Sequence, residues 1–139
     1  MEKKDVGWLI KNINEKMKVR ADADLKRDNL TFAQSRVLIF LSSKGGQATQ
    51  KEIEDFLEVS HPTVVGIVSR MEQNGFLTTW IDGKDKRNKI VKLTEQAEEI
   101  GAYMEQHLKE NEKILLAPLS AEEIEQLRRM LLAIYNNLK

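Results

Sequence analysis

The residues of this chain best suited to chemistry lie in a short polar loop, residues 82–89. The loop carries basic side chains and two aspartates: Lys84, Lys86, Arg87 and Lys89, with Asp82 and Asp85. The chain as a whole has 22 basic and 22 acidic residues, so this positive charge is local. Gathered cations suit phosphate binding, and an arginine suits a narrow minor groove, where negative potential is concentrated. We expect a nucleic-acid contact here; the alternative is a solvated hairpin tip without a partner.

The overall composition excludes several other kinds of function. The chain has 139 residues, of which 41% are hydrophobic, so we expect one domain over residues 1–139. It has no cysteine, which excludes disulfides, thiolate zinc sites and thiol redox switches. Zero net charge argues against indiscriminate coating of nucleic acid. No apolar run is long enough for a membrane span or a secretion signal, so we expect a cytoplasmic protein without a membrane partner.

An enzyme is the first rival interpretation, and the sequence does not favour it. The chain has only two histidines, His61 and His107, and neither a glycine-rich phosphate loop nor a cluster of residues at metal-ligand spacing. His61 stands at a predicted helix start and is expected to cap it or to face DNA, and His107 is expected at the surface of a helix or in its packing. We therefore predict no catalytic residues, no metal and no cofactor.

The elements around the loop predict how it is positioned. Residues 76–81 and 89–93 favour strands and so form a hairpin with the loop at its tip. Before the hairpin, Thr31 and Thr49 each precede a glutamine or glutamate by three residues, the spacing of a capping box, and Ser60 caps a further helix. Two short helices thus meet at a tight turn and a hairpin follows, which is the order of a winged helix-turn-helix.

In such a domain the second helix enters the major groove, and its two faces can be separated by periodicity. Val64, Ile67, Val68 and Met71 recur on one face and are expected in the core. The residues expected to face DNA are Ser60, His61, Pro62, Thr63, Val65, Gly66 and Arg70. Thr63 can bond a base edge or a phosphate and Val65 can contact a thymine methyl, so direct base recognition should be modest. Arg70 is expected to bind a phosphate or to pair within the helix.

Long amphipathic helices are predicted at both ends of the chain. One stripe runs through Val6, Leu9, Ile10, Ile13, Met17, Ala21 and Leu25. Another follows a three-four spacing through Ile124, Leu127, Leu131, Ile134 and Leu138. The fold class is therefore mainly α with a small β-hairpin wing. Residues 30–94 form the winged helix-turn-helix lobe, and residues 1–29 and 95–139 form flanking helices. These stripes carry more apolar surface than a small winged helix needs, so we expect a homodimer.

Several motifs resemble the MarR family of bacterial transcription regulators. They are Leu30-Thr31-Phe32-Ala33-Gln34, Ser60-His61-Pro62-Thr63-Val64, Asn74-Gly75-Phe76-Leu77, Asp85-Lys86-Arg87 and Val91-Lys92-Leu93-Thr94. The resemblance covers nearly the whole chain. It implies a homodimeric, sequence-specific regulator, most often a repressor, that binds a pseudo-palindromic operator in double-stranded DNA. It also implies release by a small-molecule effector; no motif marks the effector's pocket, so no ligand-binding residue is predicted.

The resemblance also implies roles within the wing. Arg87 corresponds to an arginine that enters the minor groove, Asp85 to the residue that braces it, and Lys84, Lys86 and Lys89 to phosphate contacts. The chain departs from the family pattern at Val65 and Gly66, where polar or basic residues are frequent, and at residues 78–80, where an arginine is frequent. Trp80 there is expected to be a packing residue. A winged-helix adaptor that binds protein instead of DNA is the second rival, and the clustered basic loop argues against it.

Overall fold

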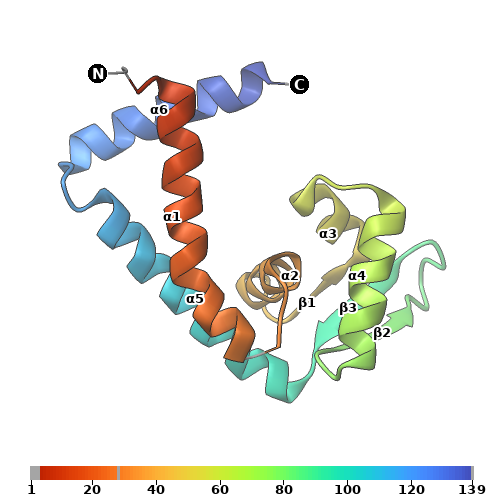
Figure 1. Ribbon diagram of the computed structural model, residues 1–139. Helices are drawn as coiled ribbons and strands as arrows, with labels where there is room; N and C mark the ends of the chain where they lie inside the picture. Colours follow the sequence, from red (N-terminus) through yellow and green to blue (C-terminus); the bar gives the residue numbers. More distant parts are fainter. Residues whose placement is uncertain (1–3, 28, 139) are drawn as a thin grey trace. The chain divides into compact units, whose positions relative to one another are not determined.

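The computed structural model describes residues 4–27 and 29–138, with backbone only over residues 21–27. Figure 1 shows the elements in order of sequence. They are α1 (Val6–Arg27), α2 (Phe32–Ser43), β1 (Gln47–Thr49), α3 (Gln50–Leu57), α4 (His61–Gln73), β2 (Leu77–Ile81), β3 (Lys89–Leu93), α5 (Glu95–Leu116) and α6 (Ala121–Asn137). The chain divides into two compact units, residues 1–102 and 103–139.

The predicted capping boxes begin the helices as the sequence indicates. The Thr49 side chain accepts from the Glu52 N–H at 3.1 Å, and the Glu52 carboxylate accepts from the Thr49 N–H at 3.0 Å. Thr31 and Gln34 make the same reciprocal pair at the start of α2. The Thr49 N–H holds the pKa of Glu52 below its ordinary value, and Lys44 at 3.4 Å acts in the same direction. Each cap satisfies amides that a helix start would otherwise leave unpaired.

A tight turn separates α3 from α4 and sets the direction of the second helix. Glu58 ends α3 in the left-handed region, with φ of 56°, and its N–H donates to the Glu54 carbonyl. Ser60 then caps α4, and Pro62 lies in the first turn, where an amide hydrogen is not needed. Gly75, with φ of +85°, follows the end of α4 and turns the chain into the hairpin. The predicted helix-turn-helix is therefore present.

The hairpin belongs to a three-stranded antiparallel sheet of order β1-β3-β2. In the wing, Leu77 pairs with Leu93 and Ile81 pairs with Lys89. The third strand, β1, was not predicted, because it is only three residues long and runs directly into the capping residue Thr49. It pairs with β3 from Gln47 opposite Lys92 to Thr49 opposite Ile90, so the base of the wing is joined to the start of α3.

The core lies between the central helices and one face of this sheet. Its fully buried side chains include Val37, Leu38, Leu41, Ile53, Val64, Val68, Met71, Leu77 and Val91. Helix α4 packs against β2, as Figure 1 also shows. The first turns of α5 pack closely on α2, because a Cβ added at Gly101 would lie 3.3 Å from the Leu38 carbonyl oxygen. The predicted fold class, mainly α with a winged helix-turn-helix, is confirmed.

The terminal helices keep their apolar stripes exposed. In α1, Leu9, Ile10 and Ile13 have exposed fractions of 42%, 44% and 44%. Helix α6 has no buried residue, and Leu131 and Ile134 are 44% and 42% exposed. Within the part of the chain that the structure describes, no helix is long and apolar enough to cross a bilayer.

Candidate nucleic-acid interface

Helix α4 separates its residues into the two faces that periodicity predicts. Val64, Val68 and Met71 are fully buried, and Ile67 is 7% exposed. All the predicted DNA-facing residues are at least partly exposed: Ser60, His61, Pro62, Thr63, Val65, Gly66 and Arg70. The buried face thus fixes the helix on the core and directs the other face to solvent. Contact of that face with DNA stays a prediction.

The first turn of α4 is tied to α3 by a hydrogen bond between side chains. The Nδ1 atom of His61 bonds the Glu54 carboxylate, which is only 12% exposed, whereas the His61 side chain is 66% exposed. At the same turn the hydroxyls of Ser60 and Thr63 lie 2.8 Å apart and share a hydrogen bond. The predicted capping role belongs to Ser60, and His61 instead links the two helices while keeping most of its ring in solvent.

Gly66 and Arg70 are neighbours on the outer face of α4. A Cβ added at Gly66 would lie 3.5 Å from an Nη atom of Arg70, so the guanidinium lies back along the helix over the glycine. That distance is an ordinary van der Waals contact. A methyl group at position 66 would therefore fit beside the arginine, so this contact does not require a glycine.

The wing tip is organised by an aspartate and an arginine two residues apart. Asp85 Oδ1 accepts from the Arg87 backbone N–H at 3.0 Å and from its Nε at 3.1 Å, and Oδ2 accepts from an Nη at 3.2 Å. These bonds, first those from the guanidinium and then that from the backbone, lower the pKa of Asp85. The predicted bracing geometry is present. The Arg87 side chain nevertheless stays 90% exposed, so its guanidinium is held in place and remains accessible.

Backbone bonds close the rest of the loop. The Asp82 N–H donates to the Asn88 carbonyl at 2.9 Å, and the Asn88 N–H donates to the Asp85 carbonyl at 3.0 Å. The Lys84 N–H donates to the Asp82 carboxylate at 3.0 Å. Lys84 and Lys86 are exposed at the tip, and Lys89 is half-buried at the start of β3. The loop therefore has a defined shape that presents its cations outward.

A hydrogen bond between α4 and the wing was not predicted. The Thr79 hydroxyl of β2 donates to the Glu72 carboxylate of α4 at 2.6 Å. Thr79 lies in the segment where the resemblance leads one to expect an arginine, so a short neutral donor here joins the helix to the wing. Its neighbour Trp80 is 44% exposed, so more than half of its surface is covered, and the packing role of Trp80 stays a prediction. The strand β2 is at the edge of the sheet, so one side of its backbone has no partner strand.

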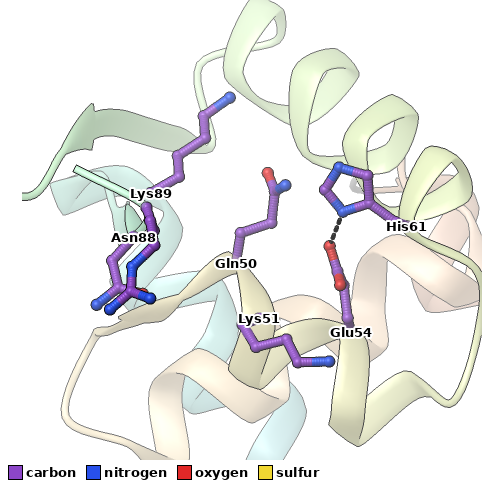
Figure 2. Close-up of a pocket in the computed structure, with 7 residues that line it drawn as sticks. Gln50, Lys51, Glu54, His61, Asn88 and Lys89 are labelled. Atoms are coloured by element: carbon purple, nitrogen blue, oxygen red, sulfur yellow. Dashed lines mark hydrogen bonds and ion pairs between the residues drawn. The ribbon is translucent and has the colours of Figure 1, made fainter. Parts of the chain in front are cut away.

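A pocket of about 230 Å³ lies where α3, the start of α4 and the wing meet. It is lined by Gln50, Lys51 and Glu54 of α3, by His61, and by residues 87–89 (Figure 2). The structure thus brings three of the predicted residues, His61, Arg87 and Lys89, to one place, whereas Lys84 and Lys86 do not line it. The α3 residues were missed, because their position beside the wing depends on the unpredicted strand β1.

The titratable residues that the structure describes form no metal-binding group. In the ranges 4–27 and 29–138, no group of three or more histidine, cysteine, aspartate or glutamate side chains could hold a metal ion. The ring of His107 lies 4.5 Å from that of Tyr103, centroid to centroid, within α5. The prediction of a surface or packing role for His107 is consistent with this contact.

Comparisons with known proteins agree with this geometry. The model of the MarR family matches residues 28–88. The uncharacterized HTH-type transcriptional regulator YwoH of Bacillus subtilis (strain 168) is 35% identical over 123 residues, which cover 84% of this chain and 86% of that protein.

Three solved structures are similar over nearly the whole chain. S. aureus MepR in its DNA-binding conformation has a TM-score of 0.88 at 26% identity, and it covers 97% of this chain and 99% of its own. The S. aureus MepR–DNA complex has a TM-score of 0.84 at 27% identity, with the same coverage. The transcription regulator MarR from Oenococcus oeni PSU-1 has a TM-score of 0.82 at 26% identity, and it covers 95% and 99%.

Proposed function

This chain belongs to the MarR family of transcription regulators, and we propose that it acts as a homodimer that binds a pseudo-palindromic site in double-stranded DNA. In this proposal α4 enters the major groove and the wing enters the adjacent minor groove. The outward face of α4 and the lysines of the wing supply the contacts. The protein is a regulator and not an enzyme.

The observation that carries the proposal is the geometry of Arg87. Its guanidinium is 90% exposed, yet two of its nitrogens and its backbone N–H are bonded to Asp85. A side chain that is both held and exposed has lost part of its conformational entropy before it binds, which is the arrangement expected of a recognition group. The negative potential of a narrow minor groove is the environment that a guanidinium prefers.

The exposed stripes of α1 and α6 support the homodimer. A second copy of the chain would bury these apolar side chains under two-fold symmetry, and two recognition helices related by that symmetry match a pseudo-palindromic site. Repression, release by a small-molecule effector and a cytoplasmic location are further parts of the proposal. Repression and release by an effector are proposed from membership of the family. The location is proposed because a transcription regulator acts where the genome lies.

Selection of bound duplexes from a random pool tests the proposal. We expect the wild-type protein to enrich an inverted repeat with half-sites roughly one helical turn apart. The Arg87→Ala variant, selected in parallel at two salt concentrations, should lose most of the enrichment. Retention that is weak and independent of sequence would contradict the proposal and would favour the protein-binding adaptor.

A further inference from the structure

The pocket between α3, α4 and the wing would lie beside a DNA strand in the proposed complex, so this inference rests on the proposed function. A recognition helix in the major groove and a wing in the adjacent minor groove must have one sugar-phosphate strand between them, because that strand separates the two grooves. The pocket lies between those two elements: His61 begins α4, and Arg87, Asn88 and Lys89 end the wing loop. A backbone phosphate therefore has to pass close to its opening.

The charges that line the pocket suit a phosphate. Lys51, Arg87 and Lys89 face one carboxylate, that of Glu54, and this carboxylate is bonded by His61. Lys51 also pairs with Asp55 at 3.1 Å, and Arg87 pairs with Asp85. Lys89 forms no ion pair with any residue that the structure describes. The pocket also adjoins the first turn of α3, where the helix dipole favours an anion.

Gln50 gives an independent indication that the pocket is incomplete. Its side chain is buried, with a relative exposure of 7%, and its Oε1 atom has no hydrogen-bond partner among the described residues. Figure 2 shows its amide directed into the space between Lys89 and His61. A buried carbonyl oxygen without a donor is unfavourable for folding, so Gln50 Oε1 indicates that a donor, such as the ammonium of the neighbouring Lys89, is missing from its place in the free protein.

We propose that this pocket is a phosphate seat, formed by Gln50, Lys51 and Lys89, that binds one phosphate of the DNA backbone between the major-groove helix and the minor-groove wing. The Gln50 Nε2 donates to a phosphate oxygen, and the ammonium groups of Lys51 and Lys89 supply the charge. The Lys89 ammonium, drawn over the pocket by the phosphate, is also the donor that Gln50 Oε1 lacks. The seat fixes the register of the protein on the duplex without reading a base.

The test uses the duplex selected by the wild-type protein, with single phosphates replaced in turn by neutral methylphosphonates. At one position beside each half-site we expect roughly a tenfold loss of wild-type affinity, the effect of one charge-assisted contact. The Gln50→Met and Lys89→Ala variants should bind the unmodified duplex roughly tenfold more weakly than the wild type. Replacing the phosphate at that position should lower the affinity of these variants little further. Lys89→Ala should also lower the salt slope of binding by about one.

Two controls separate the seat from general effects. Lys92→Ala removes the same charge from the same strand, at an exposed position that does not line the pocket, and should keep the full methylphosphonate effect. Gln50→Met removes an unpartnered buried carbonyl, so its melting temperature should equal or exceed that of the wild type. A melting temperature that falls, with an equal loss of affinity at every phosphate position, would overturn the seat by making Gln50 a structural residue.

The outcomes also separate this inference from the proposed function on which it rests. If the wild-type protein selects no duplex, the function itself fails. If it selects a duplex and Gln50→Met shows the wild-type methylphosphonate pattern, only the seat fails. Calorimetric titration with inorganic phosphate tests whether the seat binds a free phosphate compound instead of a phosphate of the DNA backbone. We expect no saturable binding of inorganic phosphate without DNA. Binding that Gln50→Met abolishes, and that competes with DNA, would assign the seat to a free phosphate compound instead.

Discussion

The central helices and the terminal helices of this chain differ in how much of their apolar surface is buried within a single chain. Helices α4 and α6 are both amphipathic and both begin at a capping serine, Ser60 and Ser120. Helix α4 buries Val64, Ile67, Val68 and Met71 against its own chain, whereas α6 has no buried residue. Two helices of the same kind thus differ in burial: the apolar face of α4 is buried, and that of α6 is exposed.

In the proposed homodimer, the stability of the single chain and the association of two copies depend on separate sets of residues. The apolar face of α4 contributes to folding of the single chain, since its burial removes apolar area from water. In the proposed homodimer, the apolar face of α6 contributes when the second copy covers it. Substitutions on the apolar face of α4 should therefore lower the free energy of unfolding, and those on the apolar face of α6 should weaken association. The size of each effect tests this distinction.

The largest effect is expected from Leu131→Asp in α6. Leu131 lies on the predicted seam and is 44% exposed, so a charge there should prevent association and, with it, binding to a two-fold site. Analytical ultracentrifugation at micromolar concentration should find a monomer, and DNA affinity should fall accordingly. Gln126→Asp, outside the seam, is the matched control and should stay dimeric. A dimeric Leu131→Asp protein would place the interface elsewhere and would break the comparison.

A pair of methionines compares the helices directly. Met71 of α4 is fully buried, and Met130 of α6 is 57% exposed. Met71→Ala should lower the free energy of unfolding by about 2–5 kcal/mol because it leaves a cavity in the core. Met130→Ala should change it by less than about 0.5 kcal/mol. Urea unfolding at one fixed protein concentration measures both, and equal losses would show that α6 is as much a part of the single-chain core as α4.

Arg87→Ala should sharpen the comparison within the DNA-facing lobe. Its side chain is 90% exposed, so the free energy of unfolding should change by less than about 0.5 kcal/mol. DNA binding should weaken by about 1–3 kcal/mol if the guanidinium enters the minor groove. Fluorescence anisotropy with the selected duplex measures the affinity, and Arg128→Ala, on exposed α6, is the control. Unchanged affinity would remove the wing from the interface.

The smallest effect is expected at Asp85. Asp85→Asn keeps an acceptor for the Arg87 backbone but loses the charge, so affinity should fall a few-fold, by less than about 1 kcal/mol. The Arg87 guanidinium and backbone lower the pKa of Asp85, so the bond is fully present above the unfolded pKa near 4 and is lost as the pH falls through the lower folded value. An NMR titration of the Asp85 carboxyl carbon should find its midpoint below that of an unpaired aspartate. An ordinary midpoint would mean that the brace does not persist in solution.

Much of the fold follows from local signals in the sequence. The capping boxes at Thr31 and Thr49 are formed as predicted, and the second wing strand has the predicted bounds, residues 89–93. These features depend on residues a few positions apart, so periodicity and spacing are sufficient. The inward face of α4 was predictable for the same reason.

The features that the sequence did not predict depend on contacts between distant segments. Strand β1 is stabilised by pairing with β3, more than forty positions along the chain, as when Gln47 pairs with Lys92. The pocket around Gln50 forms only because that pairing brings α3 beside the wing. The bond from Thr79 to Glu72 likewise depends on the packing of α4 against β2. No local pattern carries this information.

One hydroxyl gives the molecule a mechanical property. The Thr94 side chain accepts from the Ala97 N–H at 3.3 Å at the start of α5 and donates to the Gly75 carbonyl at 2.8 Å just after α4. Its backbone N–H donates to the Phe76 carbonyl at 3.0 Å, at the base of the wing. Thr94 therefore links three segments: the start of α5, the end of α4 and the base of the wing. Because one residue bonds all three segments, a displacement of the first turn of α5 would be coupled to the end of α4 and to the base of the wing together.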